Sequence, residues 1–276
     1  MSTAEAREQF LRIARLPDER IDLAEAALWV AAEQYEGLDV AGYLARLADL
    51  AERARPRLAA AGNLAERVAA LNRFLYDEQS FRGNRSDYYD ARNSFLNEVI
   101  DRRTGIPITL AIIYLAVAAR LGLPVHGVGF PGHFLLKCDA PDEIVIDPFE
   151  GTLLTREDCE ARWRATLGED TPFDARSLAP APARETLARV IGNLKQIFLA
   201  QQDWPHALAC VERILVLAPD APTELRDRGL LYARLECWSA AAADLRRFLA
   251  LAPTDPTAEG VRDQLIDLTR KSPSLH

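Results

Sequence analysis

Two side chains in the sequence have the types and the spacing that acid–base chemistry requires. His133 follows a Pro-Gly pair, and Asp147 ends a short apolar run fourteen residues later. If residues 139–141 form the turn between two antiparallel strands, His133 lies directly across from Asp147. The carboxylate would then hold the imidazole in one tautomer and stabilise its protonated form, as in the triads of hydrolases. The alternative is a structural histidine at a corner of the chain.

A nearly continuous apolar segment before this pair predicts the element that positions it. Residues 108–121 are apolar almost all round, which is typical of a helix buried at the centre of a domain. Pro107 is a favourable first residue for such a helix, and Gly122 is a favourable residue just after its end. Strand-like runs follow at residues 125–130, 133–138 and 143–147. A buried helix followed by a small antiparallel sheet indicates an α+β domain.

The segment before the central helix is predicted to be largely helical. Apolar residues recur at helical spacing in three runs, at residues 21–31, 40–50 and 64–76. We expect Asp18 and Asn63 to cap the first and the third of these helices, and the second to end before Pro56. A polar loop at residues 82–90 and a short helix at residues 93–103 lead to the central helix.

An internal repeat follows a proline-rich connection at residues 172–182. Residues 203–222 match residues 237–256 at a shift of 34 residues, and the aligned pairs include Trp204 with Trp238. A 34-residue period with two helices per unit is typical of the tetratricopeptide repeat. The repeats are expected at residues 189–222 and 223–256, with a last helix at residues 257–270.

Five short motifs occur in a fixed order between residues 93 and 149. They are NSFLN at 93–97, RTGIPITL at 103–110, LGLPV at 121–125, VGFPGHF at 128–134 and IDPF at 146–149. Together they resemble the bacterial SirB family, which belongs to the transglutaminase-like superfamily. The resemblance implies a papain-like, transglutaminase-like domain over residues 1–175 and a tetratricopeptide-like helical tail over residues 183–276. It also implies a regulatory role, since the family name is attached to the control of gene expression.

Active enzymes of this superfamily use a cysteine at the start of the central helix, with a histidine and an aspartate on the next two strands. The resemblance implies that His133 and Asp147 occupy the last two positions. The family pattern places the cysteine about fifteen residues before Gly122, where this chain has Pro107. Proline has no thiol, and it lacks the backbone N–H that commonly contributes ~3 kcal/mol to oxyanion binding. The resemblance therefore implies a remnant dyad without its nucleophile.

Three other residues are candidates for the missing nucleophile. Thr109 is the best of them because it lies two residues into the helix, although helix capping or packing is its favoured role. Cys138 is five residues beyond His133, and an odd separation along one strand points it to the opposite face. Cys159 has no evident route into the cleft.

Aromatic and basic side chains are candidates for the mouth of the remnant cleft. They are Tyr88, Tyr89 and Phe130, with Arg82, Arg85, Arg102 and Arg103. The loop at residues 82–90 is long enough to bind a ligand, but a solvated surface loop is the favoured alternative, and the sequence indicates no particular ligand.

The composition limits the kinds of partner, the cofactors and the cellular compartment that are expected. A formal net charge of −8 over 276 residues disfavours general binding to nucleic acid or to an anionic membrane. The four cysteines are widely spaced and lack zinc-ligand spacing, so neither a metal nor another cofactor is expected. The first residues lack the features of a secretion signal, and no apolar segment reaches the ~20 residues that span a bilayer. We therefore expect a cytoplasmic protein.

These observations leave three functions open. The first, which we favour, is a non-catalytic protein (a pseudoenzyme) that binds a protein or peptide through the remnant cleft, the helical tail or both. The second is an amidase, peptidase or acyl transferase that uses Thr109 with His133 and Asp147. The third is a scaffold in which His133 and Asp147 only stabilise the hairpin. The oligomeric state is left open.

Overall fold

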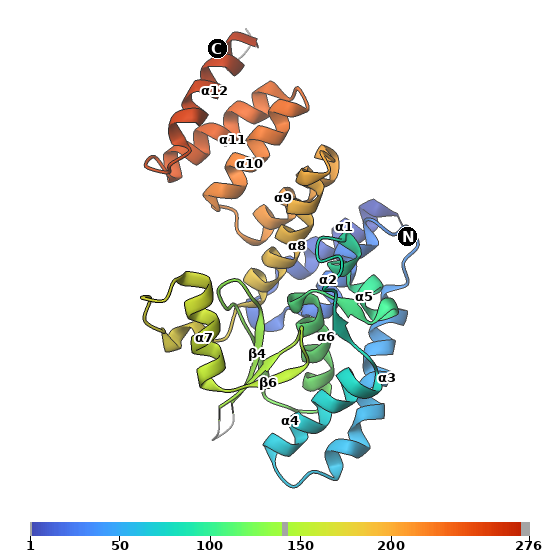
Figure 1. Ribbon diagram of the computed structural model, residues 1–276. Coiled ribbons are helices and arrows are strands. Elements are labelled where there is room, and N and C mark those ends of the chain that lie inside the picture. The colour runs from blue at the N-terminus through green and yellow to red at the C-terminus, as the bar shows by residue number, and fades with distance from the viewer. Residues whose placement is uncertain (1, 140–142, 272–276) are drawn as a thin grey trace. The chain divides into compact units, whose positions relative to one another are not determined.

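The computed structural model describes residues 2–139 and 143–271. The chain forms two compact units, residues 1–190 and residues 191–276. Figure 1 shows helices and a small sheet in the first unit and helices alone in the second. The architecture is thus the predicted one, an α+β domain followed by a helical-repeat region.

The first part of unit 1 is helical, as predicted. Its helices are α1 (Thr3–Ala14), α2 (Leu23–Ala32), α3 (Val40–Ala59), α4 (Leu64–Arg73) and α5 (Leu96–Arg102). Apolar side chains from α2 to α5 pack around the central helix α6 (Pro107–Arg120) in one continuous core. Pro107 is the first residue of α6, and Gly122 follows its end with a φ of +66°. Both ends of the central helix therefore lie where the sequence predicts them.

Two local predictions in this helical part are wrong. Asp22, not Asp18, caps α2, because its carboxylate accepts the N–H groups of Ala24 and Glu25. Asp18 instead accepts the backbone N–H groups at the start of α8 (Ala183–Ala200), 165 residues away in sequence. Helix α3 also continues past Pro56. The proline removes only the hydrogen bond to the carbonyl of Glu52, which lies on the exposed side of the helix where water can replace it.

A four-stranded antiparallel sheet follows α6, with the strands in sequential order. Its strands are β3 (Val125–Val128), β4 (Leu135–Cys138), β5 (Ile144–Asp147) and β6 (Thr152–Leu154). The first three were predicted, whereas β6 has only three residues and too little pattern to be recognised. One face of the sheet packs in the α6 core through Leu136 and Ile146, and the other packs on α7 (Arg156–Leu167) through Leu135 and Val145 (Figure 1).

A second, very small sheet connects the polar loop to the start of α6. Strands β1 (Arg82–Gly83) and β2 (Thr104–Gly105) pair in parallel over two residues each. The loop at residues 82–90 therefore begins next to the segment that leads into Pro107, the first residue of the central helix.

Unit 2 is built from the end of α8 and from helices α9 (Trp204–Leu217), α10 (Pro222–Arg234), α11 (Trp238–Leu251) and α12 (Ala258–Lys271). Helices α9 and α11 begin at the two tryptophans that the 34-residue period aligns. Gly229 of α10 lies so close to α11 that an added Cβ would stand 2.7 Å from Leu245, which explains the small residue there. The predicted helical repeat is confirmed. Among the described residues, no helix is long and apolar enough to cross a membrane.

Candidate functional site

His133 and Asp147 lie together in unit 1, with His133 Nε2 3.1 Å from Asp147 Oδ1. The sequence predicted that the two residues lie directly opposite each other, and this prediction is wrong. Leu136 pairs with Ile146, so continuing this register places Leu135 opposite Asp147. His133 precedes β4 in a turn in which its N–H donates to the carbonyl of Phe130, and the imidazole reaches the carboxylate diagonally from there. The predicted connecting turn at 139–141 lies largely outside the described residues.

Asp147 is fully buried and surrounded by donors. Its Oδ1 also accepts the backbone N–H groups of Phe149 at 2.8 Å and Glu150 at 3.2 Å. Its Oδ2 lies 2.7 Å from a guanidinium nitrogen of Arg162, which comes from α7. Burial alone would raise the pKa of Asp147, but His133, the Phe149 N–H and Arg162 together hold that pKa below its ordinary value. The carboxylate is therefore charged at neutral pH.

Arg162 is the member of this cluster that the sequence analysis missed. The side chain is 15 positions beyond Asp147 and lies in the middle of a helix rich in charged residues, so the sequence offers no signal that separates it from its neighbours. Its role depends on how α7 packs on the sheet. We call His133, Asp147 and Arg162 the Asp147 cluster.

Pro107, the residue expected at the position of the nucleophile, brings no thiol or hydroxyl group to this cluster. Pro107 is buried as the first residue of α6. Within residues 2–139 and 143–271, the His133 ring makes its polar contact with Asp147, and no thiol or hydroxyl group hydrogen-bonds to it.

The Thr109 hydroxyl is occupied by the start of the central helix. Its Oγ1 donates to the carbonyl of Asn93 at 2.7 Å and accepts the N–H of Ile106 at 3.2 Å. Thr109 has no exposed surface. These contacts correspond to the capping role and speak against use of the hydroxyl as a nucleophile, because a productive attack would break both of them.

The buried thiols are poorly suited to nucleophilic chemistry. Cys138 and Cys159 have no exposed surface, and burial raises the pKa of both. Burial also raises the pKa of Cys210 to about 12. Since the thiolate is the reactive form, these groups are protonated and inert at neutral pH. Among the described residues, no group of three or more His, Cys, Asp or Glu side chains is placed to hold a metal ion.

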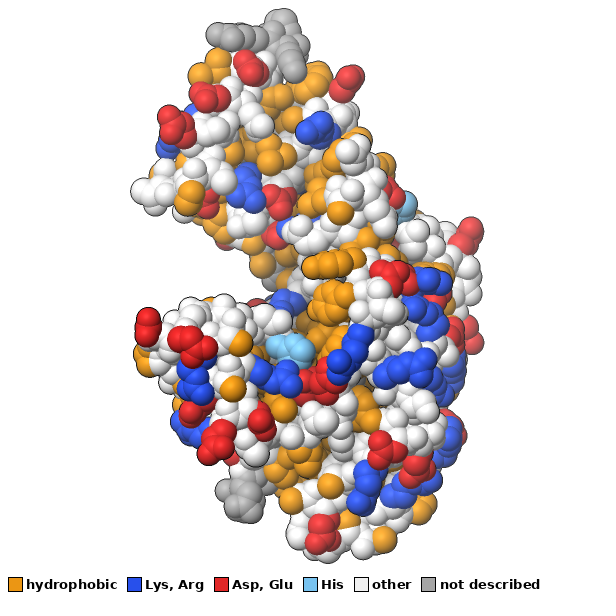
Figure 2. Space-filling view, viewed as in Figure 1, with side chains coloured by type: hydrophobic (Ala, Val, Ile, Leu, Met, Phe, Trp, Pro, Cys, Tyr) orange, Lys and Arg blue, Asp and Glu red, His pale blue; other side chains and the backbone are white. Residues whose placement is uncertain are grey.

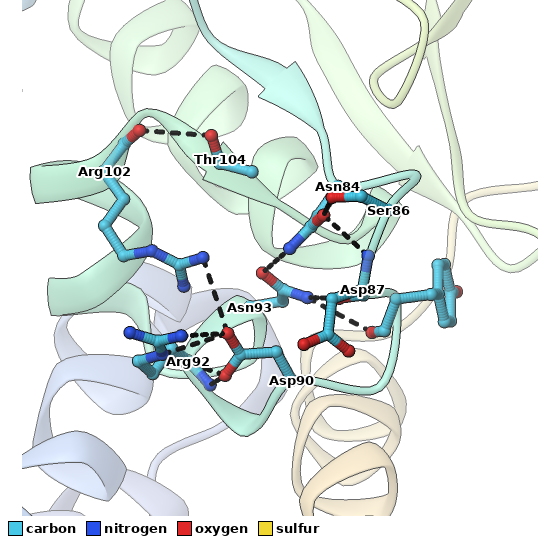
Figure 3. A network of polar contacts seen from close by, with 9 residues as sticks. Asn84, Ser86, Asp87, Asp90, Arg92, Asn93, Arg102 and Thr104 are labelled. Atoms are coloured by element: carbon cyan, nitrogen blue, oxygen red, sulfur yellow. Dashed lines mark hydrogen bonds and ion pairs between the residues drawn. The ribbon is translucent and has the colours of Figure 1, made fainter.

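The polar loop is held by two buried asparagines, as Figure 3 shows. The Asn84 amide nitrogen donates to Asn93 Oδ1 at 3.0 Å, and the Asn93 amide nitrogen donates to the carbonyls of Asp87 and Tyr88. Asn84 Oδ1 in turn accepts the N–H of Asp87 at 3.0 Å. The loop is thus anchored from within by Asn84 and Asn93, while most of its own residues remain exposed, as expected for a surface loop.

The same loop reaches the turn that follows Asp147. The N–H of Gly83 donates to the carbonyl of Phe149 at 3.0 Å, and a Cβ at Gly83 would clash with the Phe149 ring. The Phe149 ring centroid lies 6.1 Å from that of Tyr88 and 6.5 Å from that of His133. The loop and the Asp147 cluster therefore form one continuous region.

Other residues proposed for the cleft mouth have different surroundings. Phe130 is 1% exposed and packs on Trp163 in the α7 core, so its predicted place at the mouth is wrong. Arg85 pairs with Glu150, and the Arg103 guanidinium stacks over Phe81. Arg102 lies 3.6 Å from Asp90.

Comparison with known protein families agrees with this architecture. Residues 41–192, more than half of the chain, match the model of the transglutaminase-like superfamily. The chain belongs to this superfamily. Residues 194–266 match the model of the tetratricopeptide repeat.

Similar proteins occur in bacteria and in mammals. A UPF0162 protein of Xylella fastidiosa strain Temecula1 is 40% identical over 269 residues, which cover 96% of each chain. A UPF0162 protein of Pseudomonas aeruginosa is 33% identical over 215 residues, 78% of this chain and 79% of the relative. F-box only protein 21 of Mus musculus is 35% identical over 182 residues, which cover 61% of this chain and 28% of the mouse protein.

Proposed function

We propose that this protein is a non-catalytic member of the transglutaminase-like superfamily that binds a protein or peptide partner. The observation that carries this proposal is the surroundings of His133. Its ring has Asp147 on one side and, within the described part of the chain, neither a thiol nor a hydroxyl group as a hydrogen-bonding partner. With Pro107 at the family's cysteine position, the dyad has no group to activate.

The environment of Asp147 supports the same proposal. In a working triad, the carboxylate stabilises the imidazolium that forms during the reaction. Here Arg162 already lies 2.7 Å from Oδ2 and compensates part of the negative charge. The hydrogen bonds from Phe149 and Glu150 fix the turn after β5. These contacts are those of a structural carboxylate that also orients a histidine.

Unit 2 supports partner binding through its own surface. A cavity of about 400 Å³ lies between α10, Trp238 and α12, and a second of about 320 Å³ lies between α8, Trp204 and α10. Leu230 and Arg234 line both cavities, so the two are neighbours along α10. Volumes of this size hold side chains of a ligand, and helical repeats commonly present such surfaces to peptides.

A cytoplasmic, regulatory role that acts through a protein partner is part of the proposal. On the face drawn in Figure 2, the described acidic and basic side chains are intermixed and form no continuous basic area. Together with the net charge of −8, this favours protein partners over nucleic acid.

The test is an activity assay on the purified full chain. Peptide and protein substrates are incubated with and without a primary amine, and ammonia release, peptide cleavage and amine incorporation are measured. We expect no turnover above buffer and no difference between the wild type and His133→Ala. Robust turnover that disappears in His133→Ala would overturn the proposal and favour an acyl transferase.

A further inference from the structure

A second arginine lies beside His133 and has a different environment from Arg162. Arg189 comes from α8 within unit 1, and its guanidinium donates to the backbone carbonyl of His133 at 2.8 Å. The same guanidinium lies over the Phe134 ring, 5.4 Å from the ring centroid. Arg189 is therefore held in place next to the remnant site by one hydrogen bond and one ring contact.

Arg189 differs from Arg162 and Arg85 in its charge balance. Arg162 pairs with Asp147, and Arg85 pairs with Glu150. Among residues 2–139 and 143–271, Arg189 has no carboxylate partner. The contacts that it makes, to a carbonyl and to a ring, leave its positive charge without a counter-ion, and an anionic group of a ligand would supply one.

An exposed aromatic surface adjoins this arginine. Tyr88 and Tyr89 are 43% and 77% exposed, and their ring centroids lie 5.4 Å apart. Burial raises the pKa of Tyr88, and the positive charge of Arg189 acts in the opposite direction. Tyr88 in turn contacts Phe149, the ring next to His133.

The loop presents these rings in a fixed position. The amides of Asn84 and Asn93 hold the backbone at Asp87 and Tyr88 (Figure 3). Exposed aromatic side chains on a rigid backbone lose little conformational entropy when a partner covers them, which is why they contribute strongly to binding.

We infer that Arg189, Tyr88, Tyr89 and Phe149 form a binding site for the free C-terminus of a peptide whose last side chain is large and apolar. Arg189 binds the terminal carboxylate, and the aromatic rings cover the last side chain. A peptide C-terminus carries both groups on a single residue, which matches a cation without a carboxylate partner beside an apolar surface. A phosphate group carries no apolar side chain. This inference rests on the proposed function, because the peptide is bound and not consumed.

The test uses hexapeptides with a fixed last residue, either Phe, Leu, Gly or Lys, each prepared as the free acid and as the carboxamide. Binding of N-terminally fluorescein-labelled peptides to the full chain is measured by fluorescence anisotropy. The mass of each peptide is then measured by mass spectrometry to detect cleavage or modification. We expect the acids that end in Phe or Leu to bind at least 10-fold more tightly than their amides. Acids that end in Gly should bind more weakly because they lack the apolar side chain.

Variants separate the two parts of the site. Arg189→Gln should weaken the acids at least 10-fold and leave the amides unchanged, and Arg189→Lys should fall between because the charge is kept without the planar fork. Tyr89→Ala should weaken acids and amides alike. Arg85→Gln is the matched control, since Arg85 is exposed and already paired with Glu150, and should change nothing.

Two kinds of result distinguish the inference from the proposed function. Equal binding of acid and amide, no effect of Arg189→Gln, or no binding of any free acid overturns the carboxylate site and leaves the proposed function standing. Intact peptides support the proposed function, whereas cleavage or amine incorporation by the wild type overturns it. Circular dichroism of each variant establishes that a loss of binding is not a loss of fold, and Arg189→Lys keeps the test decisive if Arg189→Gln does not fold.

Discussion

Each unit of the molecule contains a buried ionic cluster, and the two clusters compared below are built differently. In unit 1, Asp147 has no exposed surface and is contacted by His133, Arg162 and two backbone N–H groups. In unit 2, Lys195 is 3% exposed and pairs with Glu224 at 2.7 Å and Asp227 at 2.9 Å. We call the second group the Lys195 cluster.

The difference between them separates a site from a structural connection. The ion-pair partners of Lys195 in the described chain are carboxylates on the neighbouring helix α10, so the charge of Lys195 is compensated within the cluster. The Asp147 cluster is less complete, because its imidazole has no polar side-chain partner other than Asp147 in the described chain. In a cluster that is fully paired, removal of one partner leaves a buried charge uncompensated, whereas a cluster with an open side can also meet a ligand.

The largest effect is expected from Lys195→Met. The substitution leaves the partly buried Glu224 without Lys195 and leaves Asp227 with Arg226 as its remaining cation, and removal of one partner of a buried ion pair typically costs ~3–5 kcal/mol. Urea unfolding of the full chain, followed by pulsed hydrogen exchange in peptides from residues 191–276, measures the loss. The variant Lys195→Met/Glu224→Gln/Asp227→Asn should recover most of it. If the single variant is as stable as the wild type, the Lys195 cluster is not a structural requirement.

Asp147→Asn should have the next largest effect, a loss of ~2–3 kcal/mol in the free energy of unfolding of unit 1. It leaves Arg162 without its counter-ion and weakens the hydrogen bonds from Phe149 and Glu150. His133→Ala should cost less than ~1 kcal/mol, because the ring is partly exposed and Arg162 still pairs with the carboxylate. Equal losses in the two variants, measured by urea unfolding, would contradict this ranking.

Thr109→Val should cost ~1–2 kcal/mol, because it leaves the carbonyl of Asn93 and the N–H of Ile106 without their partner inside the core. Thr109→Ser keeps the hydroxyl group and should lose less. Thermal unfolding measures both variants. Partner binding should survive in both, whereas catalysis that depends on the Thr109 hydroxyl would appear as activity in the wild type and Thr109→Ser but not in Thr109→Val.

The two clusters should respond to opposite ends of the pH scale. The pKa of Asp147 is held below its ordinary value of 3.8 in the folded protein, so its contribution to stability is present above pH 3.8 and is lost as the pH falls through the folded-state pKa. Burial by itself would lower the pKa of Lys195, but Glu224 and Asp227 raise it above 10.5. That contribution is complete below pH 10.5 and is lost as the pH rises through the folded-state pKa.

Difference measurements test this smallest and most specific prediction. The difference in unfolding free energy between wild type and Asp147→Asn should shrink as the pH is lowered from 6 toward 3. The difference between wild type and Lys195→Met should shrink as the pH is raised from 9 toward 12. A difference that stays constant in either series would mean that the charge concerned does not stabilise the fold.

The amino-acid sequence by itself determined the features that depend on neighbouring residues. The central helix begins at Pro107 and is followed by Gly122 as predicted, because helix ends depend on the residues at those ends. The repeat could be recognised because α9 and α11 begin with the same residue type 34 positions apart. The contact of His133 with Asp147 also followed from local spacing, although the register was misjudged by two residues.

Only the tertiary structure decided which distant side chains complete these elements. Asp18 caps a helix 165 residues away, Arg162 reaches Asp147 from α7, and Arg189 reaches His133 from α8. Each of these residues is one of many similar charged residues in the sequence. What distinguishes them is their environment in the folded protein, which has a low dielectric constant or is crowded. Contacts between segments that are distant in sequence create this environment, so the neighbouring residues in the sequence do not reveal it.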